Sequence, residues 1–87
     1  MITKKDKQVI TKLSQEYNVK QILLFGSSLT GVGNDIDLAV EGIKPEKFYS
    51  FYGDLMFALS KPVDLIDLSS TSKFIQMVRK EGVNLYG

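Results

Sequence analysis

The chain has 87 residues and a formal net charge of +1, which predicts one domain and argues against a basic surface for nucleic acid. It contains no cysteine and no histidine, which excludes disulfides, thiolate zinc sites and the commonest general base. Any metal would therefore need oxygen ligands, as magnesium and manganese do. The N-terminal residues lack the apolar core of a signal peptide, and no apolar run reaches membrane-span length, so we expect a cytoplasmic protein.

The first predicted element is an amphipathic helix from Lys4 to Tyr17. Thr3 and Asp6 resemble a capping box, in which each side chain bonds the backbone amide of the other residue. Asn18 is expected to end the helix. Its apolar face consists of Val9, Ile10, Leu13 and Tyr17.

Two strands on either side of a glycine-rich turn follow this helix. The first is predicted over residues 19–25, and its unbroken apolar run indicates burial on both faces and a central position in the sheet. The turn contains Gly26, Gly31 and Gly33. The second strand is predicted over residues 36–41.

A second helix is predicted from Pro45, which suits a first helical turn, to about Ser60. Tyr49 and Met56 flank its apolar stripe, and Phe57 falls in the middle of its polar face. These three residues have two interpretations. In the first, they have no binding role: the helix is buried on most sides, or single aromatics are exposed by chance. In the second, the three residues contact a protein partner. The apolar stripe consists of Phe48, Phe51, Tyr52, Leu55 and Leu59.

The C-terminal third predicts a strand over residues 63–68 and a helix over residues 73–81, followed by a short tail at residues 83–87. The inward residues of this helix are expected to be Phe74, Ile75 and Val78. The element order predicts a single α/β (α+β) domain over residues 1–87. We expect it to have two layers, with helices packed on a short mixed sheet.

Alternation places Asp35 and Asp37 on one face of the second predicted strand. Asp64 would lie beside them if the second and third strands are neighbours, because adjacent strands are about 4.8 Å apart. Each carboxylate pair about 5 Å apart would repel by roughly 3 kcal/mol at an effective dielectric near 20, which favours a bound cation. Two magnesium ions would suit such a triad. Alternatively, these aspartates are exposed carboxylates at the strand ends and never converge. We prefer this second interpretation for Asp67, which falls on the opposite face of the third predicted strand.

The glycine turn supplies a second feature of the same region. Gly26 ends a buried strand, where its backbone can approach a polyphosphate closely. The hydroxyl of Ser27 can donate to a phosphate oxygen, and a short helix beginning at Ser27 would add positive potential. By itself a glycine-rich turn is a weak indication of phosphate binding. It becomes a specific one when a strand with Asp-x-Asp and a third aspartate on a later strand follow it.

Gly26-Ser27, Asp35-Ile36-Asp37 and Asp64 together resemble the signature of the minimal nucleotidyltransferase (MNT) domain of the DNA polymerase beta superfamily. The resemblance implies magnesium-dependent transfer of a nucleoside monophosphate from a nucleoside triphosphate to a hydroxyl. It implies that Asp35, Asp37 and Asp64 are catalytic and hold the metal, with Asp64 helping to activate the acceptor. Gly26 and Ser27 would grip the triphosphate.

Stand-alone MNT domains resemble the antitoxins of HEPN/MNT toxin–antitoxin pairs. This implies transfer of AMP from ATP to a tyrosine of a HEPN-type toxin, without direct binding of nucleic acid or membrane. The family often carries arginines in the loop, whereas residues 26–31 here carry no positive charge. Two alternatives therefore remain: a binding-only antitoxin with an inactive site, and a small-molecule nucleotidyltransferase that works as a homo-oligomer.

Overall fold

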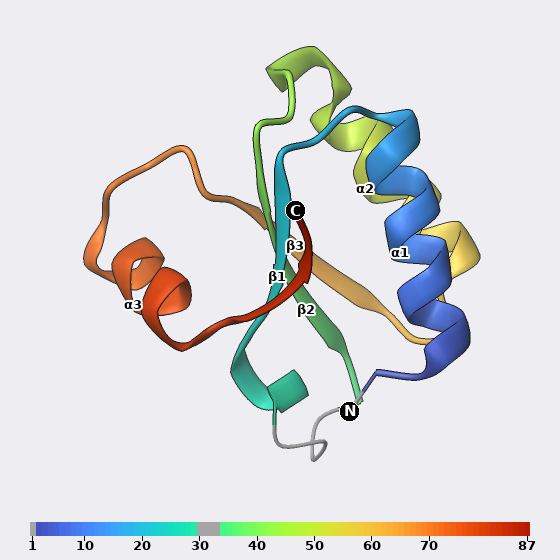
Figure 1. Ribbon diagram of the computed structural model, residues 1–87, viewed down its shortest axis with the longest axis horizontal. Coiled ribbons are helices and arrows are strands. Elements are labelled where there is room, and N and C mark those ends of the chain that lie inside the picture. Colours follow the sequence, from blue (N-terminus) through green and yellow to red (C-terminus); the bar gives the residue numbers. More distant parts are fainter. Residues whose placement is uncertain (1, 30–33) are drawn as a thin grey trace.

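The computed structural model describes residues 2–29 and 34–87 and is built around a four-stranded mixed sheet (Figure 1). The strand order is β3-β2-β1-β4. β1 pairs antiparallel with both β2 and β4, whereas β2 and β3 are parallel. The predicted mixed sheet and the central position of β1 are therefore confirmed. The strands are β1 (Gln21–Leu24), β2 (Ile36–Glu41), β3 (Val63–Asp67) and β4 (Val83–Tyr86).

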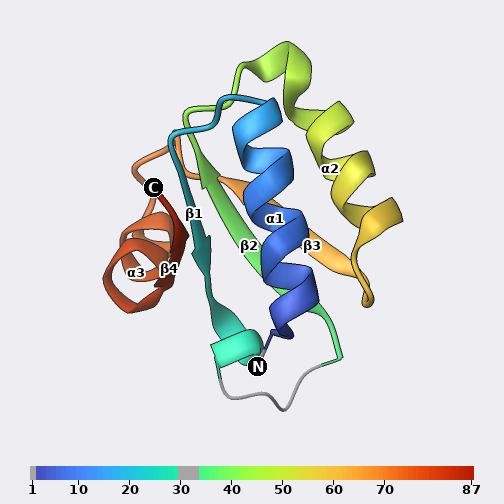
Figure 2. The ribbon, with the colours of Figure 1, turned by 45° about the vertical axis from the view of Figure 1, so that its right-hand side comes forward.

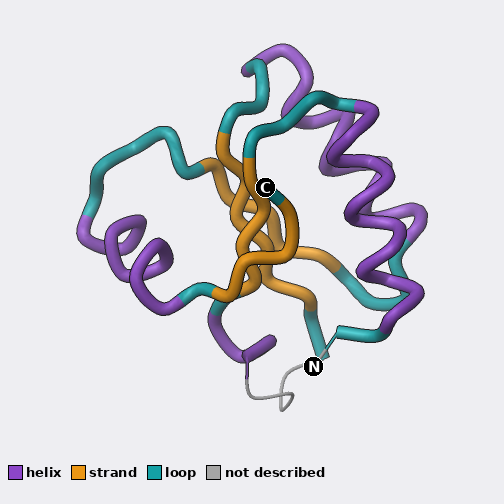
Figure 3. The backbone as a smooth tube through the Cα atoms, viewed as in Figure 1, coloured by secondary structure: helices purple, strands orange, loops and turns teal. Residues whose placement is uncertain are grey.

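The helices are divided between the two faces of the sheet (Figures 1 and 2). α1 (Lys4–Glu16) and α2 (Phe48–Ala58) cover one face, and α3 (Lys73–Glu81) covers the other. Two short 3-10 turns, η1 (Gly26–Leu29) and η2 (Pro45–Lys47), follow β1 and precede α2. Figure 3 shows η1 at the lower end of the sheet, after β1. No helix of the described residues has the length and apolar character needed to cross a membrane.

The larger core lies between the sheet and the α1–α2 layer. Alternation along β1 and β2 turns every second apolar side chain toward these two helices. Phe51 and Leu55 of α2 and Ile10 of α1 are fully buried against them. The main strand residues of this core are Ile22, Leu24, Ile36, Leu38, Val40, Val63 and Leu65.

The core under α3 is smaller. Its buried members are Leu23, Ala39, Leu68, Ile75 and Val78. Since Ala39 faces α3, alternation places Asp37 on the same face. This thinner face therefore combines apolar packing with carboxylates, whereas the α1–α2 face is closed by larger side chains.

The predicted tail at residues 83–87 is wrong, because Val83–Tyr86 forms β4 at the sheet edge beside β1. Gly82 ends α3 in an extended conformation (φ −67, ψ 152), so the chain turns directly into the strand. The register shifts between Ile22 and Leu23. A four-residue strand with such an irregularity is too short for periodicity to reveal.

Other boundaries differ by a few residues. β2 and α3 have the predicted limits, whereas the predicted strand over 19–25 forms only Gln21–Leu24. The helix predicted from Pro45 to Ser60 begins as the 3-10 turn η2 and ends at Ala58. Phe74 is not buried as predicted, since 48% of it is exposed while its ring meets that of Phe25 edge-on at 5.9 Å.

The capping box is only half formed. The Thr3 hydroxyl accepts a hydrogen bond from the Asp6 amide at 3.1 Å, as predicted. The buried Asp6 carboxylate accepts instead from the backbone amide of Ser60 at 3.2 Å and from the Ser60 hydroxyl. This carboxylate therefore joins the start of α1 to the segment after α2.

Arg79, the single arginine of the sequence, joins α3 to the sheet. Its guanidinium contacts the Glu41 carboxylate at 2.6 Å and donates to the Leu68 carbonyl at 3.0 Å. The Lys20 ammonium lies 3.5 Å from the same carboxylate. The Arg79 hydrogen bond, with the nearby positive charges, lowers the pKa of Glu41 below its ordinary value of 4.5.

We expect Glu41→Gln to reduce the free energy of unfolding at pH 7 by about 0.5–1 kcal/mol, because the ion pair is partly exposed to solvent. A lowered pKa means that this stabilisation is complete above pH 4.5 and is lost as the pH falls through the folded-state pKa. Urea unfolding at pH 7 and at about pH 3 measures the difference, with Glu46→Gln on the exposed η2 as the control. A difference between wild type and Glu41→Gln that is unchanged at the lower pH would contradict this interpretation.

Candidate active site

Two of the predicted site aspartates are direct neighbours across the parallel pair β2–β3. Asp37 and Asp64 are register partners, and adjacent strands lie about 4.8 Å apart. Asp37 is half-buried and Asp64 is exposed. Asp35 is exposed and lies in a bend directly before β2, outside the strand whose alternation was expected to orient it. The predicted adjacency of these strands and the shared face of Asp37 and Asp64 are therefore confirmed.

Gly26 brings η1 against the Asp37 carboxylate. Its φ of +65 is a conformation that residues with a Cβ rarely adopt. A Cβ placed there would also lie 3.0 Å from Asp37 Oδ2. The predicted short helical turn after β1 is present as η1, whereas Gly31 and Gly33 lie outside the described residues. The positive φ therefore favours glycine at position 26, and a side chain there would also displace the Asp37 carboxylate by a few tenths of an ångström.

Consecutive serines of η1 have different roles. The exposed Ser27 donates from its hydroxyl to Asp37 Oδ2 at 3.2 Å. The Ser28 hydroxyl is buried and accepts from the Asp37 amide at 2.8 Å. It also lies 3.1 Å from the Asp35 carbonyl and 3.3 Å from Asp37 Oδ2, either of which can accept its proton. Sequence reasoning missed Ser28; the only signal was a second hydroxyl residue after Gly26.

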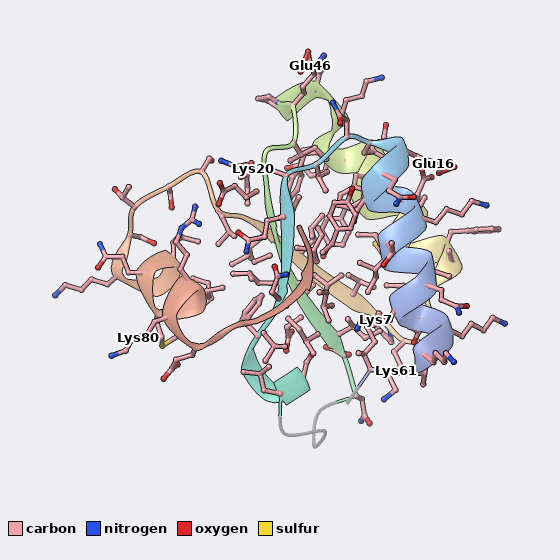
Figure 4. The ribbon with its side chains drawn as sticks, viewed as in Figure 1. Lys7, Glu16, Lys20, Glu46, Lys61 and Lys80 are labelled. Carbon is pink, nitrogen blue, oxygen red and sulfur yellow. The ribbon has the colours of Figure 1, made fainter. Side chains whose placement is uncertain are left out.

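The site is strongly acidic. Both described ion pairs are made by Glu41, so none involves Asp35, Asp37 or Asp64. The sequence has no lysine or arginine from residue 21 to residue 43. Figure 4 shows Lys20 near the end of the sheet opposite η1, and Lys80 on the outer side of α3. The described side chains therefore leave the carboxylates without a cationic partner.

Carboxylate oxygens are ligands that a hard divalent cation prefers. Asp37 and Asp64 also lie at neighbouring positions on one face of the sheet. Within residues 2–29 and 34–87, however, no three acidic, histidine or cysteine side chains converge into a group that could hold a metal ion. The expected three-carboxylate cluster is thus not assembled in this arrangement. Asp35 and Asp64 have exposed side chains, and exposed side chains change rotamer within nanoseconds.

The remaining residues considered in the sequence analysis lie away from Asp35, Asp37 and Asp64. Asp67 accepts from the Ser69 amide at 2.9 Å and closes the turn after β3, which agrees with a structural role outside the site. Tyr49, Met56 and Phe57 are on α2, across the sheet from the aspartates, and are 81%, 58% and 94% exposed. The structure therefore separates a carboxylate face from an exposed apolar surface.

Comparison with known proteins gives a consistent family. The family model "Polymerase beta, Nucleotidyltransferase" matches residues 7–87. A crystal structure of a toxin–antitoxin with AMP-PNP contains a chain 32% identical to this one, with a TM-score of 0.77; the match covers 93% of this chain and 73% of that chain. The comparison with curated protein sequences gave no match.

A second similar structure is the tri-AMPylated HEPN toxin of Shewanella oneidensis in complex with MNT antitoxin. Its matched chain is 31% identical, with a TM-score of 0.72, and the match covers 94% of this chain and 70% of that chain. A MntA-HepT toxin–antitoxin structure is also 31% identical, with a TM-score of 0.71 and the same two coverages. The likeness therefore extends over nearly the whole chain.

We expect Ser28→Ala to lower the free energy of unfolding by about 1–3 kcal/mol, because it leaves the Asp37 amide without its hydrogen-bond acceptor. Ser27→Ala is the matched control, since it removes the same atom from an exposed neighbour. Its effect should stay within about 0.5 kcal/mol. Thermal and urea unfolding of the three proteins measures this. Equal losses in the two variants would show that Ser28 does not hold β2 to η1.

Proposed function

The chain belongs to the polymerase beta nucleotidyltransferase family, and from this premise we propose that it is a protein adenylyltransferase and an antitoxin. It transfers AMP from ATP to a hydroxyl, that of a tyrosine, on a HEPN-type toxin. The reaction forms a bond between this hydroxyl oxygen and the α-phosphorus, and pyrophosphate leaves. The similar structures support the substrate and the partner, since they include a toxin–antitoxin with AMP-PNP and an AMPylated HEPN toxin with MNT antitoxin.

The observation that carries the proposal is the contact between η1 and Asp37. Gly26 and Ser27 border the same carboxylate that faces Asp64 across the parallel strands. The residues proposed to bind the phosphates and those proposed to hold the cations are thereby adjacent. Phosphoryl transfer needs both, because its catalysis depends mainly on positioning and on neutralising charge.

Asp35, Asp37 and Asp64 would hold magnesium, two ions in the arrangement we expect. Bound there, magnesium supplies positive charge to the attacking and leaving oxygens. Ser27 would exchange its bond to Asp37 for one to a phosphate oxygen, while Gly26 keeps the backbone close to the phosphates. Asp64, at the exposed edge strand, would receive the acceptor hydroxyl and help to remove its proton.

A second candidate is a binding-only antitoxin that blocks the toxin by contact. It is favoured by the absence of any basic residue from 21 to 43 and by the use of the single arginine in the Glu41 contact. A site without cations binds a triphosphate weakly unless metal or partner supplies the charge. The acidic face on β2 and β3 favours the enzyme, since contact alone would not require it.

We expect Asp37→Asn to reduce AMP transfer by about 100-fold or more, because it removes a charge that holds the metal. The assay mixes the protein, its purified partner toxin, magnesium and α-labelled ATP, and follows label on the toxin. Asp67→Asn is the matched control: it is the same substitution on the same sheet, and asparagine retains an acceptor for the Ser69 amide. It should keep full transfer.

The two candidates give different results in this assay. Label that appears with wild type and disappears with Asp37→Asn supports the enzyme. Inhibition of the toxin without label, which survives Asp37→Asn, would instead establish the binding-only antitoxin.

We further propose that the toxin docks on the α2 surface, defined by Tyr49, Met56 and Phe57. Aromatic residues and methionine are enriched at protein interfaces, and these side chains are 81%, 58% and 94% exposed. The surface lies across the sheet from the aspartates, so docking would leave the carboxylate face open to the tyrosine of the same or a second toxin subunit.

Phe57→Ala should weaken toxin binding about tenfold or more, as expected of a central aromatic contact, and should leave the fold unchanged because the side chain is exposed. Calorimetry of the complex measures the affinity, and circular dichroism checks the fold. The control is Val83→Ala, which removes an exposed apolar side chain from β4. Unchanged affinity in Phe57→Ala would place the toxin on another surface.

A further inference from the structure

A small apolar cavity lies between α3 and η1, next to the candidate active site. Its volume is about 180 Å³. Val78 is its buried residue; Phe74, one turn earlier on α3, and the adjacent Met77 are 48% and 47% exposed. The other apolar walls are Phe25 and Leu29, and Gly26 and the exposed Glu81 complete the lining.

The cavity adjoins the carboxylate site at Gly26. This residue lines the cavity and also faces Asp37, since a Cβ on it would lie 3.0 Å from Asp37 Oδ2. Both features are on the α3 face of the sheet, as the packing of Ala39 and Val78 in the core under α3 shows. Two larger cavities, lined by residues of α1 or by the ends of α1 and α2, do not include η1.

Size and chemistry identify one kind of occupant. A cavity of 180 Å³ is below the range of about 300–1,000 Å³ that holds a whole drug-sized ligand. It therefore suits a single ring system whose polar remainder lies outside. The rings of Phe25 and Phe74 and the thioether of Met77 offer stacking surfaces to a flat ring.

We propose that this cavity holds the nucleobase of the nucleotide whose phosphates lie at Gly26 and Ser27. The inference rests on the proposed function, because it requires a nucleotide at η1. The base stacks against Phe74 and Met77, and the ribose passes over Gly26. Recognition by ring faces discriminates weakly between adenine and guanine, because every base has a π-face. A purine covers more of the wall than a pyrimidine, so purine nucleotides bind more tightly.

Methyl NMR tests the location of the base in the wild-type protein. The chain has three methionines, and Met77 lines the cavity while Met56 lies on α2, across the sheet. With magnesium present, ATP should shift the ¹³C-methyl signal of Met77 by the ring current of the base. Tripolyphosphate, which has no base, should leave that signal in place. Met56 is the internal control and should be unaffected by either ligand.

Variants give a second readout. Phe74→Ala and Met77→Ala should each weaken ATP binding about tenfold while tripolyphosphate affinity stays unchanged, because only the stacking surface is lost. ATP and tripolyphosphate that both bind without moving the Met77 signal would overturn the nucleobase cavity and leave the proposed function standing. Failure of both ligands to bind with magnesium, to the chain alone and to its complex with the toxin, would overturn the proposed function, and this inference with it.

Discussion

The candidate site depends on the contacts that Asp37 makes with residues 25–28, at the end of β1 and in η1. Its amide donates to the buried Ser28 hydroxyl, and its carbonyl accepts from the Phe25 amide at 3.1 Å. Its carboxylate lies against Gly26 and accepts from Ser27. The position of η1 and the position of the Asp37 carboxylate are therefore set by the same contacts.

The unequal covering of the two sheet faces explains how such a small chain can carry this acidic site. The α1–α2 layer buries Phe51, Leu55 and Ile10 completely and supplies most of the apolar burial that stabilises the fold. The α3 face contributes a smaller core, and its helix is held by Arg79 near the end of β2 opposite η1. The end near η1 is thus left open, and there the carboxylates and the apolar cavity meet.

The sequence predicted the elements whose patterns are long and regular. Alternation over residues 36–41 gave β2 its limits, and helical spacing gave α3 its limits. It failed where tertiary contacts decide the outcome. β4 has only four residues and exists because it can pair with β1.

The same limit applies to individual side chains. Asp6 looked like part of a local capping box, but its carboxylate is used by Ser60, 54 residues away. Ser27 and Ser28 are identical in type, and only the fold determines which is buried. Asp37 and Asp64 could be assigned to one face because strand alternation is fixed, whereas Asp35 lies in a bend before β2. The convergence of the three side chains depends on rotamers that no sequence pattern specifies.

The charge distribution constrains how the nucleotide of the proposed function would bind. A triphosphate would enter beside three aspartates, and residues 21–43 contain no lysine or arginine to offset the repulsion. The single arginine is committed to Glu41, near the end of β2 opposite η1. If the proposed nucleobase cavity is correct, stacking there would add affinity without adding charge, because it acts on the base rather than on the phosphates. Under the proposed function the positive charge would come from the metal, from the partner protein, or from lysines outside that segment such as Lys61, three residues before Asp64.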